Sequence, residues 1–473
     1  MSVPGHRLDR MFNPKNVVVI GDKGPMYQWL NNNKPVLEKG GNLYSVQVDP
    51  AQIEGIEKLG IQNFTSLADV PGEIDYALVA VPRQVSPFVL KDLIAKGAHG
   101  AAFFTSGFAE TGEELGVKLQ EQLVAMAREA NFNLVGPNCM GLYLPKSGVR
   151  FSGDAPIVSD GKIGFLSQSG THGIMFSLVS NANGLQISRC ASFGNAVILD
   201  VSDYLDYLAQ DDETEVIGMY VEGVRNGRRF FETLRKATAR KPVIVWKGGQ
   251  TPAGARATMS HTASLAAPQA IWDGMMKQCG AITTNNLDET LDVMKLIVHG
   301  HRPTGPRMAL LAQTGGQSVS ITDAFAKAGL VVPRFSDESY EELSEFFNVI
   351  GGSYQNPLDM AGTVAGKMDT LDRILRIVDA DPNIDAVAVE LSAMFASRQW
   401  RRDPKTLEAT LDTLQNYHQR SPKPLLVILH PAHEGEYIAS LTPRFIERQI
   451  PLYQSFERAA GAMARYLAYV AAR

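Results

Sequence analysis

The sequence predicts an α/β protein built from parallel sheets, and three observations support this prediction. Short β-rich runs alternate with helical stretches from one end of the chain to the other, as in βαβ units. The 473 residues correspond to roughly three domains at ~150 residues each. Hydrophobic residues make up 45% of the chain and charged residues 20%, a balance that excludes disordered and fibrous classes.

Each third of the chain contains one set of predicted strands. The first set lies at residues 16–20, 43–48, 76–81, 101–105 and 133–135. The second lies at 162–166, 187–192, 215–221, 242–247 and 281–284, and the third at 308–312, 330–333, 386–390, 425–429 and 451–453. Segments rich in proline and glycine, at 144–156 and 301–306, separate the sets as linkers do. We therefore expect domains at residues 1–150, 151–302 and 303–473.

Charge and cysteine content exclude several functional classes. The chain has 45 Lys and Arg against 50 Asp and Glu, with the two signs interspersed, so it lacks the basic surface of a nucleic-acid or anionic-membrane binder. Cys139, Cys190 and Cys279 lie too far apart for a disulfide framework or a metal site. The N-terminus lacks a signal peptide and no run approaches the ~20 apolar residues of a membrane span. We expect a cytoplasmic protein with no metal of its own.

Small and polar residues follow the strands of the first domain. In open parallel sheets, ligands bind beyond the carboxyl ends of the strands. Each of these segments is also typical of an ordinary turn, but together they line one sheet edge. The first turn lacks the Gly-x-Gly-x-x-Gly spacing, which disfavours a nicotinamide-dependent oxidoreductase. The candidate residues are Gly21, Val81, Pro82, Thr105, Ser106, Gly107, Pro137 and Asn138.

The second domain carries a candidate anion site and a candidate nucleophile. Ser169, Gly170 and Thr171 lie between a strand and a helix, so backbone N–H groups and the helix dipole converge there. His172, which comes next, is either a ligand or a polar neighbour. Further on, residues 248–264 form a predicted loop of small residues around His261. That imidazole is either simply solvated or a phosphoryl acceptor.

Two motifs of other enzyme classes are incomplete. His433 and Glu434 begin like a zinc-protease helix, but no second histidine follows at the required spacing. The sequence also lacks a Gly-x-x-x-x-Gly-Lys-Ser/Thr loop, so it carries no recognisable P-loop for a nucleotide.

Taken in order, the motifs resemble those of the NDP-forming acyl-CoA synthetases, relatives of succinyl-CoA synthetase. The resemblance covers essentially the whole chain. It implies a Rossmann-like CoA-binding domain followed by two flavodoxin-like domains. It also implies the reaction, in which acyl-CoA, NDP and phosphate interconvert with carboxylic acid, CoA and NTP through an acyl phosphate and a phosphohistidine. The motifs are Phe-Asn-Pro at 12–14, Ser-Gly-Phe-Ala-Glu-Thr-Gly at 106–112, Gly-Pro-Asn-Cys at 136–139, Ser-Gln-Ser-Gly at 167–170, Tyr-Val-Glu-Gly at 220–223, Ala-Gly-Ala-Arg at 253–256, Ser-His-Thr at 260–262, Gly-Gly at 315–316 and Asn-Pro-Leu-Asp at 356–359.

The resemblance also implies residue roles. His261 matches the phosphoryl carrier, and Glu222 matches the carboxylate that orients or deprotonates its imidazole. The alternative for Glu222 is an ion pair with Arg228 or Arg229. Ser169, Gly170 and Thr171 would bind the phosphoryl group, and the strand-end residues of the first domain would bind CoA. One departure from the family pattern is the turn at residues 22–26, Asp-Lys-Gly-Pro-Met, which alters the CoA phosphate loop.

In this family an ATP-grasp module handles the nucleotide, and no part of the sequence is left to supply one. We therefore expect an α-type subunit that acts with a separate ATP-grasp β-type chain, on which ATP or ADP binds with Mg2+, in an α2β2 assembly. A second interpretation is a catalytically reduced protein that binds or senses CoA or acyl-CoA. The presence of both Glu222 and His261 favours the enzyme.

Overall fold

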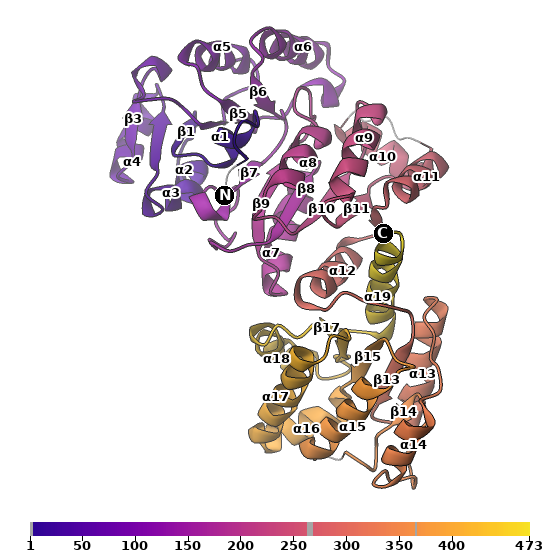
Figure 1. Cartoon of the computed structure of the whole chain (residues 1–473). Coiled ribbons are helices and arrows are strands. Elements are labelled where there is room, and N and C mark those ends of the chain that lie inside the picture. The colour runs from indigo at the N-terminus through magenta and orange to yellow at the C-terminus, as the bar shows by residue number, and fades with distance from the viewer. Residues whose placement is uncertain (1–2, 263–267, 365–366) are drawn as a thin grey trace. The chain divides into compact units, whose positions relative to one another are not determined.

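Three mostly parallel sheets form the framework of the protein, as the predicted α/β class requires (Figure 1). The structure is a computed structural model and describes residues 3–262, 268–364 and 367–473. The chain divides into two compact units, one of residues 1–181 and 185–285, the other of residues 182–184 and 286–473. The first unit holds two sheets and the second unit one. The domain boundaries near residues 150 and 302 stay predictions.

The first sheet is wholly parallel and has the strand order β3-β2-β1-β4-β5-β6. This is the doubly wound Rossmann order, whose chain reversal lies between β1 and β4. Alternate strand residues such as Val18, Val79 and Phe103 pack with α5 and α6 in one apolar core. The elements are α1 (Asp9–Phe12), β1 (Asn16–Ile20), α2 (Gln28–Asn33), α3 (Pro35–Glu38), β2 (Asn42–Val46), α4 (Pro50–Lys58), β3 (Gln62–Phe64), η1 (Leu67–Asp69), β4 (Tyr76–Val79), α5 (Ser86–Lys96), β5 (Gly100–Phe103), η2 (Ala109–Thr111), α6 (Glu114–Glu129) and β6 (Asn133–Val135).

The second sheet has the order β12-β11-β10-β8-β9-β7, in which only the edge strand β7 runs antiparallel among the described strands. Without β7 this is the flavodoxin order, with its reversal between β8 and β10. Every residue of β8 and β10 is buried, as expected for central parallel strands. The elements are β7 (Gly141–Tyr143), η3 (Pro145–Ser147), β8 (Ile163–Ser167), α7 (Gly170–Ala182), β9 (Ile187–Ser192), α8 (Val201–Gln210), β10 (Val216–Val221), α9 (Gly227–Thr238), β11 (Val243–Lys247), α10 (Pro252–Thr262), α11 (Gln269–Cys279) and β12 (Ile282–Thr284).

The third sheet, in the second unit, has the parallel flavodoxin order β14-β13-β15-β16-β17. Its strands pack with α15 and α17 in one core that includes Leu311, Val389 and Leu411. Helix α12 belongs to this unit and packs along α19. The elements are α12 (Leu287–His299), β13 (Met308–Ala312), α13 (Gly315–Lys327), α14 (Asp337–Ser344), β14 (Leu358–Asp359), α15 (Met368–Ala380), β15 (Ala386–Glu390), α16 (Ala393–Arg402), α17 (Pro404–Arg420), β16 (Leu425–Ile428), α18 (Gly435–Glu447), β17 (Leu452–Tyr453) and α19 (Phe456–Ala471).

Two predicted elements are wrong. Residues 330–333 form no strand, because Val331 makes a single parallel bridge to Arg307 and Pro333 lacks the N–H that a ladder needs. The neighbouring position beside β13 is occupied by β14 instead. Residues 252–262, predicted as part of a loop, form helix α10. Pro252 suits its first turn, and the Thr251 carbonyl accepts the Ala255 N–H at 2.7 Å.

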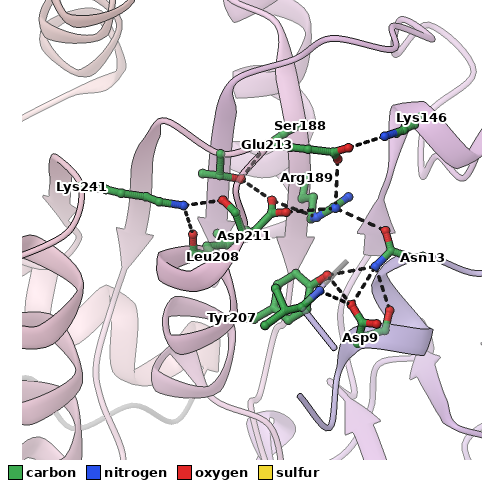
Figure 2. A network of polar contacts seen from close by, with 12 residues as sticks. Asp9, Asn13, Lys146, Ser188, Arg189, Tyr207, Leu208, Asp211, Glu213 and Lys241 are labelled. Carbon is green, nitrogen blue, oxygen red and sulfur yellow. Dashed lines mark hydrogen bonds and ion pairs between the residues drawn. The ribbon is translucent and has the colours of Figure 1, made fainter. Parts of the chain in front are cut away.

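A buried polar network joins the N-terminal segment to the second sheet (Figure 2). Arg189 on β9 is 1% exposed, and its Nε lies 3.1 Å from a carboxylate oxygen of the fully buried Asp211. The same guanidinium donates to Asn13, directly after α1, at 3.3 Å. Asn13 in turn donates to the Tyr207 hydroxyl of α8 at 3.0 Å. The network therefore fixes α1 against the second sheet.

Candidate active site

The chain reversal of the second sheet brings two predicted site segments together. β8 and β10 are neighbours, and Ser167 at the end of β8 pairs with Tyr220 near the end of β10. The turn that opens α7 therefore lies beside Glu222, which follows β10. Ligands of open parallel sheets bind at such a reversal.

Gln168 bonds the turn after β8 to the turn after β10. Its backbone N–H donates to the Tyr220 carbonyl at 3.0 Å, and its side-chain oxygen accepts the N–H groups of Glu222 and Gly223 at 2.8 and 3.1 Å. Gln168 is 4% exposed, so these bonds are shielded from water. The sequence contained Gln168 within a family motif but gave no sign of this positioning role.

The Glu222 side chain is buried, and its surroundings orient it. The Tyr220 hydroxyl donates to Glu222 Oε1 at 3.2 Å. Burial, and then the negative charge of Glu222, raise the pKa of Tyr220, so the phenol keeps the proton that it donates. Lys247, at the end of β11, donates to the carbonyl oxygens of Glu222 and Gly248 at 2.7 and 2.5 Å. Burial lowers the pKa of Lys247.

The alternative role for Glu222, an ion pair with a nearby arginine, finds no support in these contacts. Arg228 binds Glu232 on its own helix, with Nε 2.6 Å from the carboxylate. Arg229 binds Asp203 of α8 at 2.6 Å. Both arginines therefore pair with carboxylates of α8 and α9. The Glu222 carboxylate accepts a hydrogen bond from the Tyr220 hydroxyl instead.

Ser169, Gly170 and Thr171 form the N-terminal turn of the 13-residue helix α7. The Ser169 carbonyl accepts the N–H of Gly173 at 3.1 Å, which starts the helical ladder. His172, one residue further on, stacks on the Tyr220 ring with centroids 4.2 Å apart. The positive end of the α7 dipole thus lies beside the buried carboxylate. Such a setting suits a phosphoryl group that is carried on an imidazole.

His261 lies in the last turn of α10, and its side chain is outside the described part of the structure. The described part of α10 makes close contact with η2, the short helix after β5. Helix α10 therefore joins the second sheet to the loop that carries three of the predicted CoA-binding residues, Thr105, Ser106 and Gly107.

The predicted CoA-binding residues form one connected edge of the first sheet. The Thr105 hydroxyl donates to the Val81 carbonyl, and Arg83 Nη1 donates to the Gly107 carbonyl at 2.6 Å. Asn138 donates its N–H to the Thr105 carbonyl at 3.0 Å. Pro82 and Ser106 are exposed on this edge, whereas the Val81 side chain is buried and offers backbone only.

Gly21 and Pro137 complete that edge. A Cβ on Gly21 would lie 2.5 Å from Val81 Cγ1, so this turn requires glycine. The second sheet supports the other end, since the Asn195 N–H donates to the Pro137 carbonyl at 3.0 Å. Asn195 also donates to the Glu110 carboxylate at 2.7 Å, which in turn accepts the Gly107 N–H at 2.6 Å. The loops after β5, β6 and β9 therefore support one another.

The second unit has its own chain reversal, between β13 and β15. Here the Gln313 N–H donates to the buried Glu390 carboxylate at 2.9 Å, and burial raises the pKa of Glu390 to about 7. A cavity of about 250 Å³ lies at this edge, lined largely by apolar side chains, among them Met360, Leu391 and Trp400. The cavity has room for a small apolar molecule.

The described residues contain no group of three or more histidine, cysteine or acidic side chains placed to hold a metal ion. Within the same residues, no helix combines the length and the apolar character that crossing a bilayer requires.

Comparison with known proteins agrees with this geometry. Residues 26–145 match the model of a CoA binding domain, and residues 160–297 match that of the succinyl-CoA ligase like flavodoxin domain. The acetyl-coenzyme A synthetase 1 of Ca. Korarchaeum cryptofilum, solved with phosphate and ADP, superposes with a TM-score of 0.83. It is 28% identical, and the match covers 98% of this chain and 97% of that one.

Two relatives in Pyrococcus furiosus match almost from end to end. The α subunits of its ADP-forming acetate–CoA ligases I and II are 32% and 30% identical to this chain, each over 96% of both proteins. The ADP-forming acetate–CoA ligase I of Archaeoglobus fulgidus is 34% identical over 81% of this chain but only 55% of its own length. The chain therefore belongs to the family of ADP-forming acid–CoA ligases, as one of their α subunits.

Proposed function

We propose that this chain is the catalytic α subunit of an ADP-forming acyl-CoA synthetase and that His261 carries the phosphoryl group. Phosphate attacks the acyl-CoA thioester, giving acyl phosphate and releasing CoA. The His261 imidazole then attacks phosphorus and the carboxylic acid leaves. Phosphohistidine finally transfers the phosphoryl group to ADP. Each step breaks one bond to the transferred group and forms another, so no further reactant is needed.

One observation supports this proposal most strongly, namely that the buried Glu222 lies beside the N-terminus of α7 at the chain reversal of the second sheet. A carboxylate bonded to one ring nitrogen of an imidazole fixes its tautomer and leaves the other nitrogen nucleophilic. Ser169, Gly170 and Thr171 would hold the phosphoryl oxygens through backbone N–H groups. CoA would lie along the edge formed by the loops after β1, β4, β5 and β6.

The nucleotide would bind, with Mg2+, on a separate ATP-grasp subunit, in an α2β2 assembly in the cytoplasm. Two of the relatives are named as α subunits, and a third continues well beyond the region that this chain matches. All three cysteines are buried free thiols, which suits a reducing compartment. If the purified chain alone produced ATP from acetyl-CoA, ADP and phosphate, the separate subunit would be excluded.

The central experiment is to incubate the chain with acetyl-CoA and radiolabelled phosphate. We expect a protein-bound label that is labile to acid and stable to base, and that His261→Ala abolishes. His433→Ala, which alters an exposed histidine of the second unit, is the matched control and should keep the label. If CoA binds and no label forms, the chain is a CoA-binding or sensing protein instead.

A further inference from the structure

The first turn of the first sheet differs from a phosphate-binding turn. In doubly wound sheets, the phosphates of a nucleotide ligand rest on the backbone N–H groups that follow β1 and open the next helix. In this chain that turn runs from Gly21 to Tyr27 and leads into α2, at the reversal between β1 and β4. The following inference rests on the proposed function, because it takes CoA as the ligand.

A carboxylate of the chain itself already accepts hydrogen bonds from backbone N–H groups of this turn and of α2. Asp22 is 5% exposed, and its Oδ2 accepts the N–H of Leu30, in the first turn of α2, at 2.8 Å. Its Oδ1 accepts the N–H of Lys23 at 3.0 Å. Burial raises the pKa of Asp22, and hydrogen bonds from the N–H groups of Leu30, Lys23 and Trp29 oppose that rise. The Asp22 carboxylate thus accepts hydrogen bonds from two backbone N–H groups of this turn and helix.

The remainder of the turn is bonded to the strand and helix next to it. The Gly24 N–H donates to the Gln52 side chain at 2.7 Å, and Pro25 has no N–H to offer. Gln47, which is buried after β2, donates to the Asp22 carbonyl at 2.8 Å. Neither Gly24 nor Pro25 therefore presents a backbone donor to a ligand.

Tyr27 packs against the first two turns of α4. Its hydroxyl donates to the Gln52 carbonyl at 3.2 Å. A Cβ on Gly55 would lie only 2.0 Å from that hydroxyl, so the ring packs directly on a glycine of α4. In addition, α2 has only six residues, which makes it a weak dipole for a phosphate.

We infer that Asp22 takes the position of the CoA pyrophosphate at the first turn, and that this chain holds CoA chiefly through its pantetheine arm. The arm would lie along the loops after β4, β5 and β6, where Thr105, Gly107 and Asn138 form one connected edge. The nucleotide end of CoA, with its phosphates, then adds little to the affinity.

Calorimetric titration of the full chain with CoA and with pantetheine tests this inference directly, because pantetheine lacks all the phosphates and the nucleoside. We expect the two dissociation constants to differ by less than about tenfold. A larger preference for CoA would overturn the inference and leave the proposed function standing. If neither compound binds, the proposed function fails, and the inference fails with it.

Variants at Asp22 provide a second measurement. Asp22→Ser shortens the acceptor and releases the Leu30 N–H, so CoA should bind at least about fivefold more tightly while pantetheine binding stays unchanged. Asp22→Asn keeps the size and an acceptor oxygen but removes the negative charge, and should tighten CoA binding less. Asp92→Ser, on the exposed face of α5, is the control. If folded Asp22 variants, verified by circular dichroism, bind CoA no better than the wild type, the inference is wrong.

Discussion

At the scale of single residues, Glu222 is the side chain on which the proposed chemistry depends most directly. Glu222→Gln keeps the shape and the contact with Tyr220 but removes the charge that would stabilise an imidazolium. We expect the rate of His261 phosphorylation to fall by about 10²-fold, the lower range for a lost general base. Rapid-quench labelling with acetyl-CoA and phosphate measures this rate. Glu232→Gln, on the exposed part of α9, is the control, and equal rates in the two variants would assign Glu222 a structural role.

Glu390 makes stability depend on pH in an uncommon direction. Its folded pKa of about 7 lies above the ordinary value of 4.5, so the folded state binds the proton more tightly. That stabilisation is present at low pH and is lost as pH rises from about 4.5 through 7. Glu390→Gln cannot ionise, so its stability relative to wild type should rise by about 3 kcal/mol between pH 4.5 and pH 8. Urea denaturation at both pH values tests this, and a constant difference would contradict it.

The sequence predicted individual site residues unevenly. His261, Glu222 and the α7 turn could be named as candidates because a family motif surrounds each one, and their roles stay predictions. Gln168 and Lys247 support Glu222 through hydrogen bonds from the neighbouring strands β8 and β11, and Tyr220 does so from two residues earlier in the chain. Such contacts depend on which strands are neighbours, and a linear pattern does not contain that order.

At the scale of elements, the loop after β9 packs through one glycine against the edge of the first sheet that carries the predicted CoA-binding residues. Gly194 has a φ of +49°, and a Cβ there would lie 2.0 Å from the Asn138 carbonyl oxygen. Gly194→Ala should therefore displace the loop after β6, weaken CoA binding by about tenfold and destabilise the chain by about 1–3 kcal/mol. Calorimetry and thermal melting measure the two effects. Gly227→Ala has open space around it and should change neither.

The central strands were predicted well because buried parallel strands are continuous apolar runs bounded by turns. The central strands β1, β9, β13 and β15 have the predicted bounds, and so does the short edge strand β6. The sequence missed β3, β7 and β14, which are only two or three residues long and lie at sheet edges. It also missed helix α10, because a run of alanine, glycine and threonine resembles a loop in composition while alanine favours a helix.

At the scale of the whole molecule, the network around Arg189 joins the N-terminus to the second sheet (Figure 2). Arg189→Met would leave the Asp211 carboxylate buried without its guanidinium. We expect a loss of about 3–5 kcal/mol in the free energy of unfolding. Urea denaturation measures it. The control Arg228→Met, whose parent side chain is 83% exposed, should change stability by less than about 1 kcal/mol.

The division of the chain into sheets and compact units was predictable only in part. Length and alternating elements predicted three α/β sheets, and the structure contains three. The two compact units divide at residue 285, however, where no proline-rich linker occurs. Helix α12 packs along α19, about 170 residues further on, and this long-range contact determines its unit.

The packing of Trp272 limits how far His261 could move as the phosphoryl carrier that we propose. Trp272 on α11 is 2% exposed and stacks on Phe230 of α9, with ring centroids 5.8 Å apart. Trp272 lies only eleven positions after His261 in the chain. A chain of eleven residue steps spans at most about 40 Å when fully extended. While Trp272 stays packed, the His261 backbone would therefore remain within that radius of Trp272 in the proposed mechanism, and an inserted stretch of glycine and serine between α10 and α11 would extend it.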